Sequence, residues 1–363
     1  MKTFWLFTLL VLSPFIAQSA NHAVILEYHH VGTNTPPSTS VSPEDFDKHL
    51  SYLEENNFQV WPLLKVIEHL KNNLEIPDKC VVITMDDGYK SVYTEAWPRL
   101  KKRGWPLTVF VSPKFISKNR WPYMNWDELR TLHKEGVTIA NHSQKHHHLI
   151  RRKTGESLQQ WRQRVESDIR VAQQNIKKEI GTVPDLFAYP FGEYNNRLRA
   201  IVKDFGLVGI AQLSGPASKH SDFAAIPRFA MAMKYTKMDS FRVKVNSLPF
   251  KVLSATPTEL LLNYPNPKDP DAARPTMTLK IERGGFREHQ FACYATGSTK
   301  PLPIDIIEKT DTTLTLKVQS HSPLPAGRSR YNCTAPRLDG KRFYWYSHGW
   351  IRRMDNRKWH PEH

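Results

Sequence analysis

Short apolar segments alternate with amphipathic ones between about residues 22 and 245. The clearest helix is predicted over 157–180, where apolar residues recur every three or four positions and Gly181 follows. A second is predicted from Pro43, which Ser42 can cap. The apolar segments are rich in β-branched or aromatic residues, as buried strands are, and comprise 23–28, 80–85, 107–111, 137–140, 185–189 and 207–211. This strand-then-helix order predicts parallel strands with crossover helices, in a barrel or a wound sheet.

The pattern changes after about residue 246. Segment 263–275 is rich in proline and polar residues, and long helical stripes disappear. Short alternating segments follow, typical of a small antiparallel β domain, at 276–282, 291–295, 313–319 and 343–347. The predicted organisation is therefore a signal peptide over 1–19, an α/β domain over 20–246 and a β-rich domain over 247–363.

The first residues have the features of an export signal. Lys2 gives a positive start, residues 4–16 are almost all apolar, and small residues precede a cleavage point after Ser19. The apolar stretch is shorter than the ~20 residues that a spanning helix needs, and no later segment approaches that length. We therefore expect a soluble periplasmic or extracellular protein without a membrane span after signal removal; an uncleaved anchor is the alternative.

The net charge of +16, from 51 Lys and Arg against 35 Asp and Glu, favours polyanionic partners. The basic residues are scattered and no recognised nucleic-acid motif occurs, so an anionic cell envelope or acidic glycan is the better expectation than nucleic acid. Of three cysteines, Cys293 and Cys333 could pair in an oxidising compartment, whereas Cys80 is expected to be a buried thiol.

Candidate chemistry lies at the predicted strand ends, where functional groups gather in parallel α/β folds. Asp86 and Asp87 follow the second strand, and His142 and His146 follow the fourth. Two imidazoles and one carboxylate form an open set of metal ligands, so Asp87, His142 and His146 are predicted to bind a metal. Asp86 would then act as general base. Either segment alone is more often a solvated turn; their joint occurrence indicates a site.

Three motifs carry a family resemblance. "ITMDDGY", "HSQKHHHL" and "FAYPFGEYN" resemble, in this order, motifs of the NodB-type polysaccharide deacetylases (carbohydrate esterase family 4). The opening "ILEYHHVG" and the later "SPEDFDKHLSYLEENNF" resemble the branch that contains the poly-N-acetylglucosamine deacetylases. The resemblance covers about residues 22–235 and does not extend to the C-terminal part.

The resemblance implies a distorted (β/α)7-type barrel and an enzyme that hydrolyses N-acetyl groups of a β-linked amino-sugar polysaccharide, releasing acetate. It makes Asp86 the base and Asp87, His142 and His146 the ligands of a divalent metal, most often zinc (Zn2+). The partner is then an N-acetylated polysaccharide or oligosaccharide.

Two departures from the family pattern affect the expected site. The late Leu-x-His motif that usually supplies the acid has no clean copy, and the branch with an early Tyr-His places that histidine at the first strand. His29 is thus the candidate acid, with His30 in reserve and a structural histidine as the alternative. The arginine that usually orients the base is replaced by Ala188, and our hypothesis is that Arg228 in "IPRF" holds Asp86 instead.

Four aromatic residues are candidates for substrate contact. Trp126 and Tyr194 have faces that suit sugar rings, although both equally suit barrel packing. Phe191 and Tyr89 are expected to shape the acetyl pocket, and the Tyr89 N–H is a candidate oxyanion donor. The aromatic segment 343–350 suits either a glycan platform or a core, because alternation in a strand sends successive rings to opposite faces.

Two other functions are compatible with these residues. The same metal chemistry would cleave an ester, which makes an O-acetyl polysaccharide esterase the nearest rival. A rival from a different class is an inactive glycan-binding protein on the same scaffold. The intact Asp-Asp-Gly and His-x-x-x-His argue for an enzyme, while the missing arginine argues mildly for the binding protein.

Overall fold

The computed structural model describes residues 19–117, 121–262 and 273–361 of the 363-residue chain. Of the predicted signal peptide, only Ser19 lies within the described residues. Ser19 and Ala20 form β1 (Ser19–Ala20). In the described ranges, no helix is long and apolar enough to cross a bilayer.

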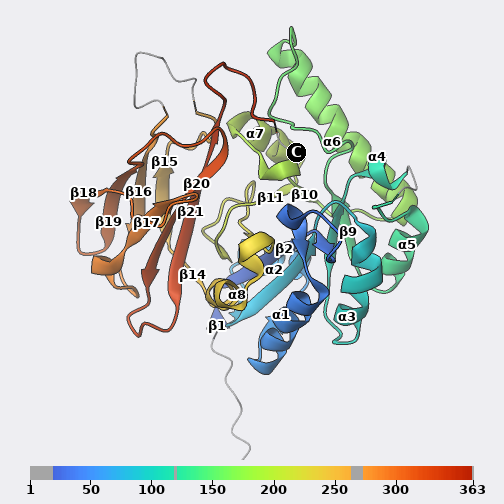
Figure 1. Cartoon of the computed structure of the whole chain (residues 1–363), viewed down its shortest axis with the longest axis horizontal. Helices are drawn as coiled ribbons and strands as arrows, with labels where there is room; N and C mark the ends of the chain where they lie inside the picture. Colours follow the sequence, from blue (N-terminus) through green and yellow to red (C-terminus); the bar gives the residue numbers. More distant parts are fainter. Residues whose placement is uncertain (1–18, 118–120, 263–272, 362–363) are drawn as a thin grey trace, which may run out of the picture.

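A curled, mostly parallel sheet forms the centre of the N-terminal part (Figure 1). Its strand order is β11-β10-β9-β8-β7-β2, and the strands lie within about two residues of the predicted positions. They are β2 (His22–Tyr28), β7 (Cys80–Met85), β8 (Thr108–Val111), β9 (Thr138–Asn141), β10 (Leu186–Ala188) and β11 (Val208–Ile210). The predicted parallel strands are therefore confirmed.

The sheet is a half-barrel rather than a fully closed one. Ile226 bridges Ile210 of β11, and β13 (Phe229–Ala230) pairs in parallel with β2. One segment thus spans the gap between the two ends of the sheet. Short strands join this sheet: β5 (Gln59–Val60) pairs with the start of β7, and β12 (Ala217–Ser218) pairs with β2. Two further pairs form separate small sheets, β6 (Ile76–Pro77) with β1 and β3 (His30–Val31) with β4 (Ser40–Val41).

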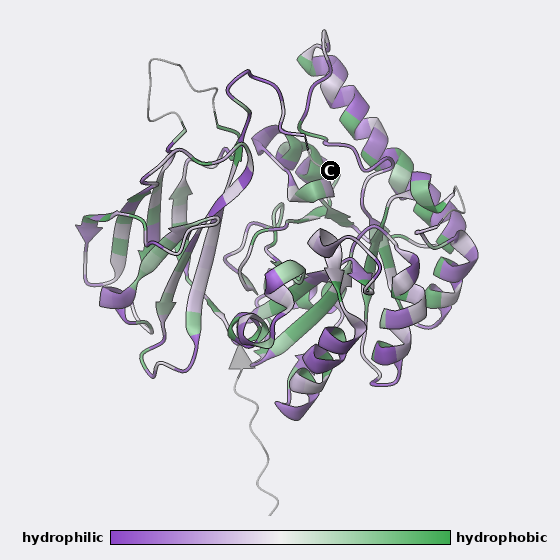
Figure 2. Cartoon of the chain, viewed as in Figure 1, coloured by the Kyte–Doolittle hydropathy of each residue, from purple (hydrophilic) through white to green (hydrophobic). Residues whose placement is uncertain are grey.

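Helices cover the sheet and bury its apolar strands (Figure 2). The two predicted helices are confirmed, and their caps explain their bounds. Ser42 accepts a hydrogen bond from the Asp45 N–H at the start of the first, and Gly181 ends the other in the left-handed region at φ 92°. The helices are α1 (Pro43–Glu55), α2 (Leu63–Lys71), α3 (Trp97–Lys101), α4 (Pro113–Ile116), α5 (Trp126–Lys134), α6 (Leu158–Ile180), α7 (Asn196–Asp204) and α8 (Met238–Val245).

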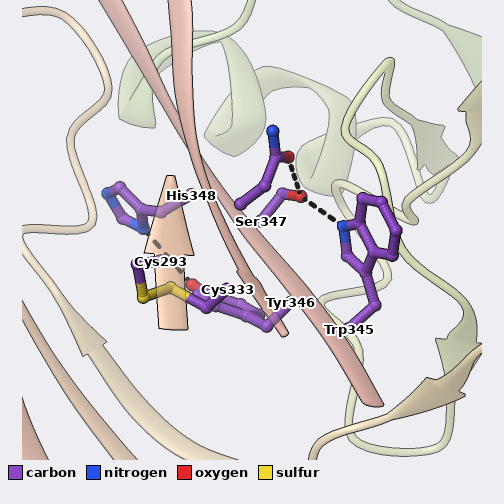
Figure 3. The surroundings of a disulfide bond; sticks show 7 residues. Cys293, Cys333, Trp345, Tyr346, Ser347 and His348 are labelled. Atoms are coloured by element: carbon purple, nitrogen blue, oxygen red, sulfur yellow. Dashed lines mark hydrogen bonds between the residues drawn. A yellow bond between two sulfur atoms is a disulfide. The ribbon is translucent and has the colours of Figure 1, made fainter. Parts of the chain in front are cut away.

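Two four-stranded sheets form the C-terminal part, in the orders β14-β21-β20-β17 and β15-β16-β19-β18. They share an apolar core, and the Cys293–Cys333 disulfide joins β17 to β20 (Figure 3). The strands are β14 (Leu248–Pro249), β15 (Val252–Thr256), β16 (Thr276–Glu282), β17 (Ala292–Ala295), β18 (Ile304–Lys309), β19 (Thr313–Gln319), β20 (Gly327–Pro336) and β21 (Phe343–Arg352). Whether this part is an independent domain from residue 247 stays a prediction.

Successive aromatic residues of β21 point to opposite faces of the sheet, as expected for a strand. Tyr344 and Tyr346 pack against the core of the two C-terminal sheets. Trp345 points the other way, and its ring lies 5.2 Å from that of Phe229 in the half-barrel. One pair is therefore core, and Trp345 contributes to the contact between the two parts of the molecule.

Candidate active site

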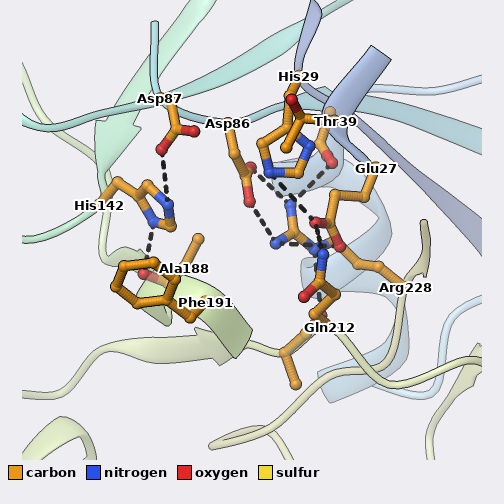
Figure 4. Close-up of polar contacts among 12 residues, drawn as sticks. Glu27, His29, Thr39, Asp86, Asp87, His142, Ala188, Phe191, Gln212 and Arg228 are labelled. Atoms are coloured by element: carbon orange, nitrogen blue, oxygen red, sulfur yellow. Dashed lines mark hydrogen bonds and ion pairs between the residues drawn. The ribbon is translucent and has the colours of Figure 1, made fainter. Parts of the chain in front are cut away.

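The predicted metal ligands meet at the carboxyl-terminal edge of the parallel sheet, where Figure 4 shows Asp87 and His142 in contact. The Asp87 Oδ1 lies 3.3 Å from the His142 Nε2 and 3.1 Å from the His146 Nε2. Two ligand atoms each about 2.1 Å from a tetrahedral centre would lie about 3.4 Å apart, so these separations suit a shared ion. Three protein ligands leave one coordination position open, as in catalytic sites.

Hydrogen bonds fix the His142 imidazole and the backbone of His146. The His142 Nδ1 donates to the Ala188 carbonyl oxygen at 2.9 Å, which leaves the Nε2 lone pair free for a metal. The Ser143 Oγ accepts the His146 N–H at 2.9 Å, and the Asn141 Oδ1 accepts the Ser143 N–H at 2.8 Å. The His142 ring and the His146 backbone are therefore held in place without an ion.

Left-handed backbone clusters around these ligands. Asp87, Ser143, His146 and Phe191 have φ values of 70°, 67°, 50° and 59°. A non-glycine residue in this region costs roughly 1–3 kcal/mol and persists only where the surroundings impose it. The sequence at this edge of the sheet therefore favours site geometry over local backbone stability.

Asp86 points away from the ligand triad and pairs with Arg228. The guanidinium donates to both carboxylate oxygens, at 2.8 and 2.7 Å, and is itself only 1% exposed. Burial alone would raise the pKa of Asp86, but the charge and hydrogen bonds of Arg228 hold it below its usual value. The contact hypothesised from the sequence is present, and Asp86 is kept ionised.

Asp87 is also kept ionised. Burial would raise its pKa, but hydrogen bonds from His142 and His146 hold it well below the usual value. Burial likewise opposes protonation of His142, yet the hydrogen bond to Asp87 raises the pKa of that imidazole overall. Asp87 thus attracts both imidazoles, and a divalent cation bound by the three side chains would replace this attraction.

Glu27 is a buried carboxylate that the sequence reasoning missed. It lies on β2, only 1% exposed, with its Oε2 3.6 Å from the Arg228 Nη2. The Gln212 Nε2 donates to its Oε1 at 2.6 Å, and burial raises its pKa. A glutamate inside the apolar run "AVILEY" was the available signal, because a charge is costly in a buried strand.

The two adjacent histidines occupy different environments. The His29 Nε2 lies 3.7 Å from the Glu27 Oε1, and Glu27, His29 and Asp86 each offer an atom within 4.8 Å of the others. His30 is 3% exposed and stacks on Tyr89 at 3.5 Å between ring centroids. Burial lowers the pKa of His30 to about 4. Of the two, His29 is the one beside the candidate base.

Two of the four candidate substrate residues border the ligand triad. The Phe191 ring lies 4.5 Å from that of His146 and stacks on His148 at 3.8 Å. Burial and the neighbouring Asp87 carboxylate raise the pKa of Tyr89. The bridge between Tyr89 and Tyr123 is closed by the flanking Lys90 and Met124 N–H groups, so the Tyr89 N–H takes no part in it.

The other two candidates pack within the protein. The Trp126 indole donates to the Ser117 Oγ at 3.0 Å and packs against the half-barrel core. Tyr194 is 5% exposed and lies 5.2 Å from the Tyr189 ring. The burial of Tyr194 fits the packing alternative, whereas Trp126 is half-buried and its role in sugar contact stays a prediction.

Comparison with known proteins defines the class of the fold. The family model described as polysaccharide deacetylase matches residues 73–210, a range that contains Asp86 and the three candidate metal ligands. Residues 73–210, less than half of the chain, are therefore similar to a polysaccharide deacetylase domain. His29 and Arg228 lie outside the matched range.

Several known proteins are similar to this chain. YxkH of Bacillus subtilis, provisionally named a polysaccharide deacetylase, is 28% identical over 205 residues, covering 56% of this chain and 69% of YxkH. The poly-beta-1,6-N-acetyl-D-glucosamine N-deacetylase of Escherichia coli K12 is 22% identical over 247 residues, covering 58% of this chain and only 37% of that enzyme. The structure of IcaB from Ammonifex degensii aligns with a TM-score of 0.52 and 21% identity, covering 61% of this chain and 94% of IcaB. The structure of the Streptococcus pyogenes deacetylase PplD in complex with acetate aligns with a TM-score of 0.53 and 22% identity. The alignment covers 59% of this chain and 93% of PplD.

Proposed function

We propose that this protein is an exported, metal-dependent enzyme that removes N-acetyl groups from a β-linked amino-sugar polysaccharide and releases acetate. One observation carries the proposal: an ionised carboxylate, held by a buried arginine, lies beside a three-residue metal-ligand set in a polysaccharide deacetylase domain. The named activity of the Escherichia coli relative supports the choice of an N-acetylated glycan. The disulfide supports a periplasmic or extracellular location.

Asp87, His142 and His146 would hold the metal, and two imidazoles with one carboxylate suit Zn2+. When bound, the metal polarises the acetyl carbonyl and makes a water molecule more acidic. The donor set fits this role because its atoms already face one point and the Asp87 carboxylate is ionised.

The chain's own residues would then carry the protons. Asp86, oriented by Arg228, takes a proton from the attacking water as the new C–O bond forms. The Tyr89 N–H donates to the carbonyl oxygen as negative charge develops there. His29 gives a proton to the sugar nitrogen when the C–N bond breaks, leaving acetate and a free amine. Phe191 forms a wall of the acetyl pocket.

Acetate release from a glycan panel tests this assignment. Wild type should release acetate from N-acetylated glycans, lose this activity with a chelator and regain it with zinc. Asp86→Asn keeps the shape of the side chain but cannot take a proton, so turnover should fall roughly 10²–10⁴-fold. Metal content, measured by elemental analysis, should stay near that of wild type because Asp86 is not a ligand.

The same panel separates the rival functions. Preferential release from O-acetylated glycans would favour the esterase. Glycan binding without acetate release, even after zinc is restored, would favour an inactive binding protein. The presence of Arg228 at Asp86 weakens that last reading, because the absent motif arginine was its main support.

A further inference from the structure

A groove of about 430 Å³ lies between β20 and the mouth of the half-barrel. Its volume is in the range of sites that bind small molecules or sugar units. It is continuous with the candidate active site through Phe191 and Gln212, and among the described residues its lining includes no aspartate or glutamate. Its titratable lining residues are Tyr235, Arg328, Arg330 and His360.

The C-terminal sheet supplies the cationic wall of this groove. Alternation along β20 places Tyr331 in the core and Arg328 and Arg330 on the face toward the half-barrel. The Arg328 Nη1 donates to the Gln212 Oε1 at 2.8 Å and to the Phe191 carbonyl oxygen. The Arg330 Nη1 donates to the Ser214 Oγ at 3.0 Å. Both arginines therefore reach the loop that borders the catalytic carboxylates.

Positive charge here exceeds negative charge. Arg330 has a neutral hydroxyl as its side-chain partner, and within the described ranges it forms no ion pair. Lys244, behind the same wall and only 5% exposed, donates to the Ala230 carbonyl oxygen and lies 4.3 Å over the Tyr235 ring. Because burial lowers its pKa to about 7, Lys244 adds only part of a positive charge at neutral pH. The nearby Glu27 is already bound by Gln212 and close to Arg228. A cation in such surroundings gains from an anion supplied by a ligand.

We propose that this groove binds the carboxylate of an acidic sugar while the neighbouring N-acetylated sugar of the same chain lies at Asp86. The substrate class is then an acidic, N-acetylated polysaccharide in which uronic acids accompany amino sugars. The inference rests on the proposed function for the identity of the second sugar. A planar guanidinium matches a carboxylate in geometry and charge, and the groove offers no like-charged group to repel it.

Direct binding to the Asp86→Asn protein tests the groove without turnover. The probes are fluorescently labelled oligosaccharides of hyaluronan, which alternates a uronic acid with N-acetylglucosamine, and of chitin, which is neutral. Fluorescence anisotropy should show hyaluronan binding roughly tenfold tighter at low salt, with the difference shrinking at high salt. Equal affinity for the two glycans, or tighter binding of chitin, would overturn the proposal.

Substitutions of Arg330 test whether the preference for hyaluronan arises in the groove. In the same background, Arg330→Gln should weaken hyaluronan binding about tenfold more than chitin binding, the loss expected for one charge-assisted contact. Arg330→Lys should retain most of the salt-dependent affinity. The matched control is Arg283→Gln, whose guanidinium bonds to Glu288 and Thr310 outside the groove and whose loss should change neither affinity. Equal losses for both glycans in Arg330→Gln would contradict the assignment.

The two proposals fail separately. A hyaluronan preference that depends on Arg330, together with no acetate release by wild type, would remove the enzymatic function and leave the groove. Acetate release from neutral glycans, with no preference for acidic ones, would remove the groove assignment and leave the enzyme. If Arg330→Gln does not fold, the salt series on the Asp86→Asn protein and the Arg330→Lys variant still decide.

Discussion

At the scale of single residues, the site is a pair of buried charges beside a ligand triad. Arg228 takes the place of the arginine that Ala188 replaces in the motif, although it lies far along the chain. A buried ion pair is weak evidence for stability, because desolvation offsets much of its attraction. Its value here is positional: two parallel hydrogen bonds fix the plane of the Asp86 carboxylate.

Removing Arg228 should therefore affect turnover more than metal binding. In Arg228→Met we expect a loss of at least about 10²-fold in kcat, because Asp86 is neither oriented nor held ionised. Zinc content should be nearly unchanged, since the triad keeps its own hydrogen bonds. Leaving Asp86 buried and unpaired should also lower the free energy of unfolding by about 3–5 kcal/mol, measurable by urea titration. Equal activity in the variant, or parallel loss of zinc, would reject the assignment.

The acid role of His29 can be tested by the choice of leaving group. His29→Ala should lose roughly 10²-fold in acetate release from an N-acetylated glycan, because the amine needs a proton to leave. Hydrolysis of 4-nitrophenyl acetate should be far less affected, since nitrophenolate leaves without one. A similar loss with both substrates, measured with matched zinc content, would make His29 a structural histidine.

Site residues could be predicted where their position follows from the nearby sequence, and could not where it depends on contacts with residues far along the chain. Asp87, His142 and His146 could be predicted because strand ends of a parallel sheet converge whatever the details of packing. Glu27 was missed because the contact that accommodates its buried carboxylate is made by Gln212, about half the chain away. Tyr194 could not be placed, because whether an aromatic ring is exposed or buried depends on elements distant in sequence.

At the scale of elements, local signals account for most of the fold. Apolar runs predicted the long parallel strands, and caps predicted the helix bounds. The segment that spans the gap in the half-barrel was not predictable, because β13 has only two residues and pairs with β2 about two hundred residues earlier. Such a short pairing is specified by tertiary packing, and a sequence window carries little information about it.

One helix carries a pH-sensitive contact in the core. His49 of α1 is fully buried, bonded to the Tyr28 hydroxyl at 3.0 Å and to the Thr236 carbonyl oxygen at 2.7 Å. Burial lowers its pKa from 6.5 to about 4. The unfolded chain therefore binds a proton more readily than the folded one between these values, so stability is lost as the pH falls from 6.5 to 4.

His49 should accordingly account for up to about 3 kcal/mol of acid sensitivity. We expect His49→Gln, which keeps an amide donor but does not titrate, to be less stable than wild type at neutral pH. Its free energy of unfolding should fall less between pH 6.5 and 4. Urea unfolding of both proteins across this range measures the difference, and parallel curves would contradict the role of His49.

At the scale of the whole molecule, the C-terminal sheets are joined to the half-barrel by polar contacts as well as by Trp345. Arg342 donates to both Asp78 carboxylate oxygens, at 2.8 and 3.0 Å. Arg328 and Arg330 bind the loop at the catalytic mouth. Figure 1 shows β20 and β21 on the side of the C-terminal sheets that faces the half-barrel.

The disulfide should stabilise the C-terminal sheets without contributing to the metal site. Replacing Cys293 and Cys333 by serine removes a cross-link between positions 40 residues apart, with an expected cost of roughly 2–4 kcal/mol. Denaturant unfolding should show this loss, and zinc content should not change. Reductant should destabilise wild type and leave the double variant unaffected; equal sensitivity of the two would exclude the disulfide as the cause.

The hydrogen bond from Arg328 to Gln212 has a practical consequence for protein engineering. Gln212 holds Glu27 with its amide nitrogen and accepts from Arg328 with its amide oxygen, so one side chain ties β2 to β20. Trimming the gene to the segment that matches the deacetylase model, residues 73–210, would delete Gln212 together with both of its partners. The shortest expression product that retains the native entrance to the catalytic carboxylates should therefore extend through β21.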